Sequence, residues 1–137
     1  MTTPAVLSAE PQLFVTDIAA CCDFFVRRLG FAVAFVHGEP AFYAQVERGG
    51  ARLNLRHVDR LPFDAGFRAR ERDALSATLL VDAIDALFRE YQAAGVEFHQ
   101  PLKTESWGAR TFIVADPDGN LIAFGQPVAA GTGEPAA

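Results

Sequence analysis

Cysteine is scarce in this sequence, and the two that occur exclude a disulfide-stapled fold. Cys21 and Cys22 are neighbours within a helical pattern, where their side chains diverge and are hard to join. Reduced thiols in or near a core are typical of a reducing compartment. A catalytic cysteine would need a nearby histidine to form its thiolate, and the local sequence offers none. We therefore interpret both cysteines as packing residues.

Long apolar runs and an excess of basic residues are also lacking. The apolar runs fall far short of the ~20 residues that cross a bilayer, and the first residues form neither a basic leader nor a signal region. Seventeen acidic against twelve basic residues give a net charge of −5, and the arginines are scattered, which argues against nucleic-acid binding. We expect a cytoplasmic protein with no nucleic-acid or membrane partner, whose long-range field favours a cationic small molecule.

What the sequence does contain is a repeated unit. The segments LFVTDIAACCDFFVRRLGFAVAF and LLVDAIDALFREYQAAGVEFHQ each read as a strand, an Asp, an amphipathic helix, a Gly and another strand. The valines that end the two first strands, Val15 and Val81, are 66 residues apart. Asp17 is a candidate N-cap, and Gly30 and Gly95 are candidate helix ends. The helical stripes comprise Ile18, Cys21, Cys22, Phe25 and Leu29 in the first copy and Ile84, Leu87, Phe88 and Tyr91 in the second.

Alternation and turn residues predict the remaining strands. In ARLNLRHV, residues 51–58, one face carries Leu53, Leu55 and His57, and the other carries Arg52, Asn54 and Arg56. A Gly-Gly turn joins this strand to AFYAQVE, and in the second half DPDG joins ARTFIVA to NLIAF.

The sequence thus predicts an α+β fold of two tandem βαβββ modules in one domain, residues 10–126. Module one spans about 10–58, a linker 59–75, and module two about 76–126; residues 1–9 and 127–137 are expected to be flexible tails. The linker contains Phe63 and Phe67. These rings pack either over a cleft or a partner subunit, or at the edge of the core.

Two segments, PQLFVTDIAACCDFFVRRLGF and WGARTFIVADPDGNLIAF, carry a resemblance to a known family. The sequence resembles the vicinal oxygen chelate superfamily of glyoxalase I, extradiol dioxygenases, fosfomycin-resistance enzymes and bleomycin-resistance proteins. The resemblance covers about residues 10–125. It implies two modules whose sheets curl around a shared concave cleft, often in a homodimer.

The resemblance also locates the positions that hold the metal in metal-dependent relatives. Here these positions are occupied by Glu10, Asn54, Ser76 and Ala123. Only Glu10 is a good ligand for a divalent ion, and Ala123 cannot ligate. The three histidines, His37, His57 and His99, show no paired metal-ligand spacing. We therefore expect no metal and no cofactor, and a divalent-metal glyoxalase or dioxygenase is disfavoured.

What remains resembles the bleomycin-resistance branch, in which the drug is bound without catalysis in grooves between two subunits. That branch uses a Trp of a WG motif and a Phe shortly after LGF, which match Trp107 and Phe35. Planar cationic or heteroaromatic compounds stack well on such rings. Trp107 as a lid over the core is the structural alternative. The acidic residue that precedes the matching Phe in some relatives is Ala34 here, so the compound need not be bleomycin.

Four further residues are candidate ligand contacts. Asn54 would orient a polar ligand edge. Arg56 and Arg110 would bind a carboxylate or stack on a ring, although solvated strand arginines are an equal alternative. Phe112 alternates with Arg110 on its strand, so the two stand or fall together, and for the ring a core position is the simpler interpretation.

Two classes of function follow from these residues. The first is a metal-free small-molecule-binding protein of the bleomycin-resistance type, active in antibiotic resistance and dimeric. The second is a metal-independent enzyme of lyase or isomerase type, with Glu10 as general base in an apolar cleft and Arg56 or Asn54 stabilising an oxyanion. We favour the binding protein over the enzyme. The sequence leaves the ligand, any chemistry after binding, and strand exchange in the dimer undecided.

Overall fold

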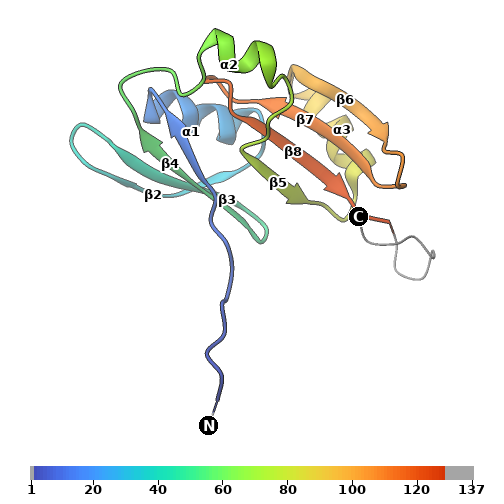
Figure 1. Cartoon of the computed structure of the whole chain (residues 1–137). Coiled ribbons are helices and arrows are strands. Elements are labelled where there is room, and N and C mark those ends of the chain that lie inside the picture. Colours follow the sequence, from blue (N-terminus) through green and yellow to red (C-terminus); the bar gives the residue numbers. More distant parts are fainter. Residues whose placement is uncertain (1, 129–137) are drawn as a thin grey trace.

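Residues 2–128 are described by a computed structural model, which has the predicted α+β architecture (Figure 1). Module one comprises β1 (Gln12–Val15), α1 (Ile18–Arg27), β2 (Ala32–His37), β3 (Tyr43–Arg48) and β4 (Ala51–His57). Module two comprises β5 (Ala77–Leu80), α3 (Ile84–Ala93), β6 (Phe98–Thr104), β7 (Arg110–Ala115) and β8 (Leu121–Gln126). A short helix, α2 (Ala65–Arg70), lies between them. The prediction of two βαβββ units is confirmed.

Each module forms its own four-stranded sheet. Sheet A has the order β1-β4-β3-β2 and sheet B the order β5-β8-β7-β6. In both, the first strand pairs in parallel with the last, and the other pairs are antiparallel. The register also repeats, because Gln12 pairs with Asn54 in sheet A and Thr78, 66 residues later, pairs with Ala123 in sheet B.

The two long helices form where the sequence predicts them, whereas α2 lies in the predicted linker and was not predicted. The Asp17 carboxylate caps α1 by accepting a hydrogen bond from the Ala20 amide at 3.0 Å. Gly30 and Gly95 follow the two long helices with φ of 72° and 76°, a conformation that costs other residues energy. The stripe of α1 is buried as predicted, and so are Ile84, Leu87 and Tyr91 of α3.

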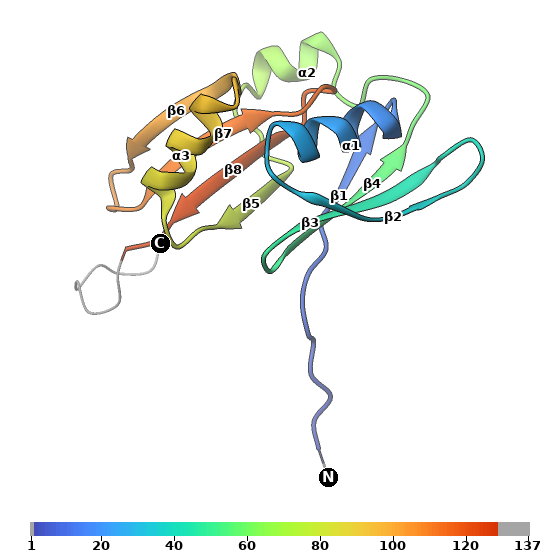
Figure 2. The ribbon, with the colours of Figure 1, turned by 180° about the vertical axis from the view of Figure 1, so that it is seen from behind.

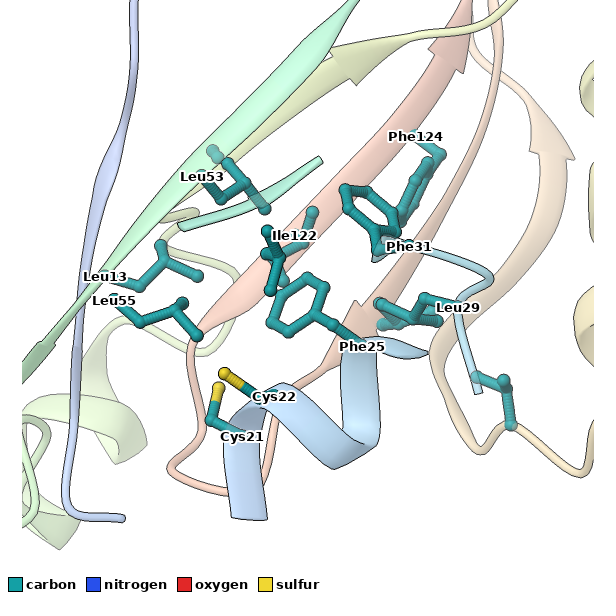
Figure 3. Close-up of a cluster of buried hydrophobic side chains, with 14 of the residues drawn as sticks. Leu13, Cys21, Cys22, Phe25, Leu29, Phe31, Leu53, Leu55, Ile122 and Phe124 are labelled. Atoms are coloured by element: carbon teal, nitrogen blue, oxygen red, sulfur yellow. The ribbon is translucent and has the colours of Figure 1, made fainter. Parts of the chain in front are cut away.

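Both long helices lie on the same side of the two sheets (Figure 2). On that side a single hydrophobic core contains residues from both modules. Figure 3 shows Phe25 of α1 packed between Leu55 of sheet A and Ile122 of sheet B. The opposite face of each sheet is covered by neither α1 nor α3. We call these two surfaces the open faces.

The linker forms an aromatic and cationic cluster outside that core. Phe63 and Phe67 stack with ring centroids 5.9 Å apart, and the Arg68 guanidinium lies 4.6 Å from the Phe63 centroid. Arg68 also donates to the carbonyl of Gly119 at 3.0 Å, which ties α2 to the turn between β7 and β8. None of the helices formed by residues 2–128 is long and apolar enough to cross a membrane.

The tails predicted at residues 1–9 and 127–137 are described in part. Residues 2–9 form no helix or strand and are exposed, extending away from sheet A in Figure 1. Residues 1 and 129–137 lie outside the described part of the chain.

Candidate functional site

The open face of sheet A carries two rows of side chains that run across all four strands. Because Leu13, Leu53, Leu55, Ala44 and Val46 fill the core, the residues that alternate with them point to the other face. The strand register places the first row in the order Gln12, Asn54, Gln45 and Phe35, and the second in the order Phe14, Arg56, Tyr43 and His37. Three predicted contacts, Phe35, Asn54 and Arg56, therefore lie together on one surface.

The first row is polar except for Phe35, and its amides are linked to Glu10. Gln45, although only 8% exposed, donates through Nε2 to Asn54 Oδ1 at 2.8 Å and to Glu10 Oε1 at 3.2 Å. Asn54 donates through Nδ2 to the same Glu10 oxygen at 3.3 Å. Two neutral amides thus orient one carboxylate on the open face. The apolar cleft expected around Glu10 is not what the structure has, since the carboxylate is exposed and its neighbours are amides.

The second row is mainly aromatic, and the ring of Phe35, at the end of the first row, packs against it. The rings of Phe35 and Tyr43 stack with centroids 6.2 Å apart, and the Phe35 and His37 rings are 4.8 Å apart. Tyr43 donates its hydroxyl to Gln12 Oε1 at 3.0 Å, which fixes the phenol between the rows. Phe14 is 42% exposed and is therefore accessible on this face. A planar ligand could stack on this group of rings.

Trp107 lies on the other module, in the turn between β6 and β7. Gly108, with φ of 99°, permits this turn, in which the Glu105 amide donates to the Ala109 carbonyl at 2.7 Å. The indole is 47% exposed, so Trp107 is not a lid over the core of this chain. Beside it on the open face of sheet B, the Glu105 carboxylate accepts a hydrogen bond from Thr111 Oγ1 at 2.8 Å.

Two predicted contacts are wrong in their placement. Phe112 is fully buried on the helix side of sheet B, stacked on Phe124 with centroids 5.1 Å apart and edge-on to Tyr91 at 5.8 Å. Arg110 points to the same side and pairs with Asp85 of α3, with Nη2 and Oδ1 2.7 Å apart. Both side chains lie on the same side of sheet B, as strand alternation requires, but that side faces the helices and both residues contribute to packing and pairing within the fold.

The metal positions of the wider family hold a poor ligand set here. Glu10 and Asn54 are adjacent, the Ser76 hydroxyl donates to Asn120 Oδ1 at 2.9 Å, and Ala123 has no donor atom. Among residues 2–128 no group of three or more His, Cys, Asp or Glu side chains is arranged to hold a metal ion. His57 and His99 instead lie near Asp59 and Asp73, at 3.9 and 2.8 Å.

The cysteines are unsuited to nucleophilic catalysis. Burial raises the pKa of the Cys21 thiol strongly, and the nearby Asp116 carboxylate, with Oδ2 3.8 Å from Sγ, raises this pKa further. Burial also raises the pKa of Cys22. Neither thiol is held as a thiolate near neutral pH, so both are packing residues.

A cavity of about 670 Å³ lies away from these residues, on the boundary between the modules. Its lining includes Phe31, Leu79 and Tyr91, and the Arg48–Glu90 ion pair at 2.6 Å crosses it. None of the predicted contacts contributes to this lining. We place the candidate site on the open face of sheet A, because the predicted contacts Phe35, Asn54 and Arg56 lie there together.

The structure adds contacts that sequence reasoning missed, namely Gln12, Phe14, Tyr43, Gln45 and Glu105. For Tyr43 and Gln45 a signal was present, since in AFYAQVE they alternate with the core residues Ala44 and Val46. Gln12 could be found from its position two residues after Glu10. Glu105 could not, because a turn residue has no periodicity to place it.

Comparisons with known proteins identify the family of this chain. The family model described as Glyoxalase/Bleomycin resistance protein/Dioxygenase superfamily matches residues 7–124. A bleomycin resistance protein of Geobacillus stearothermophilus is 31% identical over 137 residues, which cover 90% of this chain and 98% of the relative.

Solved structures of bleomycin-binding proteins have a similar fold. A bleomycin-binding protein from bleomycin-producing Streptomyces verticillus, in complex with copper(II)-bleomycin, is 29% identical and superposes with a TM-score of 0.71 over 92% of this chain and 100% of its own. Another bleomycin-binding protein in complex with bleomycin has the same fold, with a TM-score of 0.72 at 21% identity over 90% of this chain and 100% of its own.

Proposed function

Because the chain belongs to the glyoxalase/bleomycin resistance protein/dioxygenase superfamily, we propose that it sequesters a small aromatic or cationic compound of the bleomycin type, without a metal and without catalysis. The ligand would bind in two grooves, each formed between two copies of the chain. This would make the protein a cytoplasmic homodimer that confers drug resistance by binding.

The observation that carries this proposal is the separation of the two exposed aromatic sites. Phe35 is on β2, the outermost strand of sheet A, and Trp107 follows β6, the outermost strand of sheet B. Figures 1 and 2 both place these strands at opposite ends of the molecule. One ligand can therefore be flanked by Phe35 and Trp107 only if the two rings come from different chains.

The charge distribution supports a ligand with a cationic part. Glu10 on the open face of sheet A and Glu105 on that of sheet B would face the same groove in such a dimer, with Lys103, 3.7 Å from the Glu105 carboxylate, offsetting part of the second charge. The net charge of −5 adds a favourable long-range field for a cation. Each aromatic stack would contribute ~0.5–1.5 kcal/mol beyond the burial of its surface.

Fluorescence of the single tryptophan tests the proposal. Bleomycin, followed by other cationic aromatic antibiotics, is titrated into the protein while Trp107 emission is recorded, with Trp107→Phe studied by calorimetry as the control. We expect saturable quenching at micromolar or lower concentration and weaker binding by Trp107→Phe. If no compound of the panel changes the Trp107 emission or produces a heat of binding, the drug-binding function is refuted.

A metal-independent enzyme is the second candidate, because the Asn54 amide donates to the carboxylate of Glu10, an exposed residue. In that case Glu10 would act as general base and Asn54 would stabilise a developing oxyanion. Glu10→Gln separates the candidates: an enzyme would lose turnover of a substrate it still binds, whereas a sequestering protein has only affinity to lose.

A further inference from the structure

We propose that the open face of sheet A selects ligands that carry an anionic group as well as a cationic one, with Arg56 binding the anion and Glu10 the cation. This inference rests on the function proposed above and specifies the chemical class of ligand. The acidic composition of the chain alone would favour a simple cation.

Arg56 differs from the other arginines that lie on strands. Arg48, Arg52 and Arg110 each pair with a carboxylate, at 2.6, 3.2 and 2.7 Å, from Glu90, Glu47 and Asp85 respectively. Within residues 2–128 the Arg56 guanidinium makes no ion pair, no side-chain hydrogen bond and no cation–π contact. Its charge is therefore available on the open face.

The neighbours of Arg56 favour a planar anion. Arg56 pairs across the sheet with Phe14 of β1 and Tyr43 of β3, so its side chain emerges between two aromatic ones. A planar group bound to the guanidinium would therefore also meet two aromatic side chains, on which it can stack. The five N–H donors of a guanidinium form a fork that matches a carboxylate in bidentate geometry.

Glu10 provides the opposite charge in the adjacent row. Its Oε1 accepts both amide hydrogen bonds, from Gln45 and Asn54, and these neutral donors do not cancel the charge. No donor from the described residues reaches Oε2. That oxygen is free to accept a hydrogen bond from an ammonium or amidinium group of a ligand.

The strand geometry gives a length scale for the spacing of the two charges. Asn54, which donates to Glu10, and Arg56 are two residues apart on β4, and two residues span about 7 Å along a strand. A ligand that reaches both groups is an aromatic compound whose cationic donor and carboxylate or similar anion are separated by a distance on the order of 7 Å. The other charged groups on this face, Arg52 and Glu47, neutralise each other.

The test compares two probes built on one naphthalene ring. The first bears an ammonium group alone, and the second bears the ammonium group and a carboxylate about 7 Å away. Affinities are measured by calorimetry for the wild type, Arg56→Gln and Glu10→Gln. Arg60→Gln is the matched control. Arg60 is an exposed arginine in the linker, so this substitution removes the same charge from a residue outside the strands of sheet A.

We expect the wild type to bind the dipolar probe about tenfold more tightly than the cationic one. Arg56→Gln should abolish this preference and leave the cationic probe unaffected, Glu10→Gln should weaken both probes, and Arg60→Gln should change neither. A wild type without preference for the dipolar probe, or equal losses in Arg56→Gln and Arg60→Gln, would overturn the inference even if bleomycin binds. If the wild type binds neither probe nor bleomycin, the proposed function fails as well.

Discussion

Trp107 and Phe112 are close in sequence, yet the structure gives them opposite surroundings. Trp107 stands 47% exposed in a turn, whereas Phe112 is fully buried among Tyr91, Phe98 and Phe124. Both were candidate ligand contacts from the sequence. Only burial separates a ring that can meet a ligand from a ring that holds the core together, so substitutions at the two positions should have different consequences.

Truncation of Phe112 should destabilise the protein. Phe112→Ala would remove a fully buried ring and leave a cavity, which lowers the free energy of unfolding by about 3–5 kcal/mol. Trp107→Ala, at an exposed turn, should change this free energy by less than about 1 kcal/mol. Urea unfolding monitored by circular dichroism measures both values. Similar losses of stability in the two variants would contradict the placement described above.

At the scale of elements, the turn between β7 and β8 joins the two modules. The Thr16 hydroxyl, just after β1, donates to Asp118 Oδ1 at 2.6 Å, and Asn120 Nδ2 donates to the Phe14 carbonyl at 3.0 Å. Asp116 lies beneath and accepts the amides of Asp118 and Asn120 at 2.9 and 2.8 Å. Burial raises the pKa of Asp116 to about 6, although these hydrogen bonds act to lower it.

Asp116 should make the stability of the junction depend on pH. Its pKa in the folded state, about 6, lies above the ordinary 3.8, so folding favours the protonated carboxyl. Asp116 therefore does not penalise folding below about pH 4, where its carboxyl is protonated in both states. The folded state loses stability relative to the unfolded state as the pH rises through about 6. Relative to Asp116→Asn, the free energy of unfolding of the wild type should fall by about 2 kcal/mol from pH 4 to pH 7.

Urea unfolding of the two proteins at a series of pH values measures this difference. The comparison with Asp116→Asn cancels the titration of the other carboxylates, which both proteins share. A difference that stays constant with pH, or that grows in favour of the wild type as the pH rises, would show that Asp116 is not destabilised by its burial.

At the scale of the whole molecule, the single chain has two open faces, and its two long helices cover neither of them. Its helices share one core on the other side of the sheets, and the aromatic sites of Phe35 and Trp107 lie on the outer parts of different modules. If the ligand lies between chains, each groove of a symmetric dimer takes Phe35 from one chain and Trp107 from the other.

Mixed dimers provide a direct test of this arrangement. Phe35→Ala and Trp107→Ala homodimers should each bind bleomycin at least about tenfold more weakly than the wild type. Co-refolding the two variants should restore wild-type affinity in about a quarter of the sites, because half of the dimers are mixed and each has one groove with both rings. Calorimetric titration measures the number of tight sites.

A site formed within one chain would give no such recovery, since every chain in the mixture lacks one ring. The control is Phe35→Ala refolded alone by the same procedure. If its affinity for bleomycin also recovers, the recovery is an effect of refolding and not of mixed dimers. The measured stoichiometry therefore distinguishes a shared groove from two independent faces.

Much of the fold follows from local patterns in the sequence. The repeat of 66 residues, the N-cap at Asp17 and the glycines after each helix fix the element order, because helix ends and strand alternation depend on near neighbours. The alternation in ARLNLRHV likewise placed Asn54 and Arg56 on one face. Arg110 and Phe112 alternate equally well, but alternation does not say which face receives the helix.

The sequence by itself determined the two βαβββ modules, the shared face of Asn54 and Arg56 on their strand, and the weak metal-ligand set. Tertiary structure alone decided that the helices share one core, that Gln45 and Asn54 converge on Glu10, and that Phe35 and Trp107 end far apart. The physical reason is that local patterns report the contacts of residues near in sequence. The packing of one module against another depends on side chains up to a hundred residues away, as the pairing of Thr16 with Asp118 illustrates.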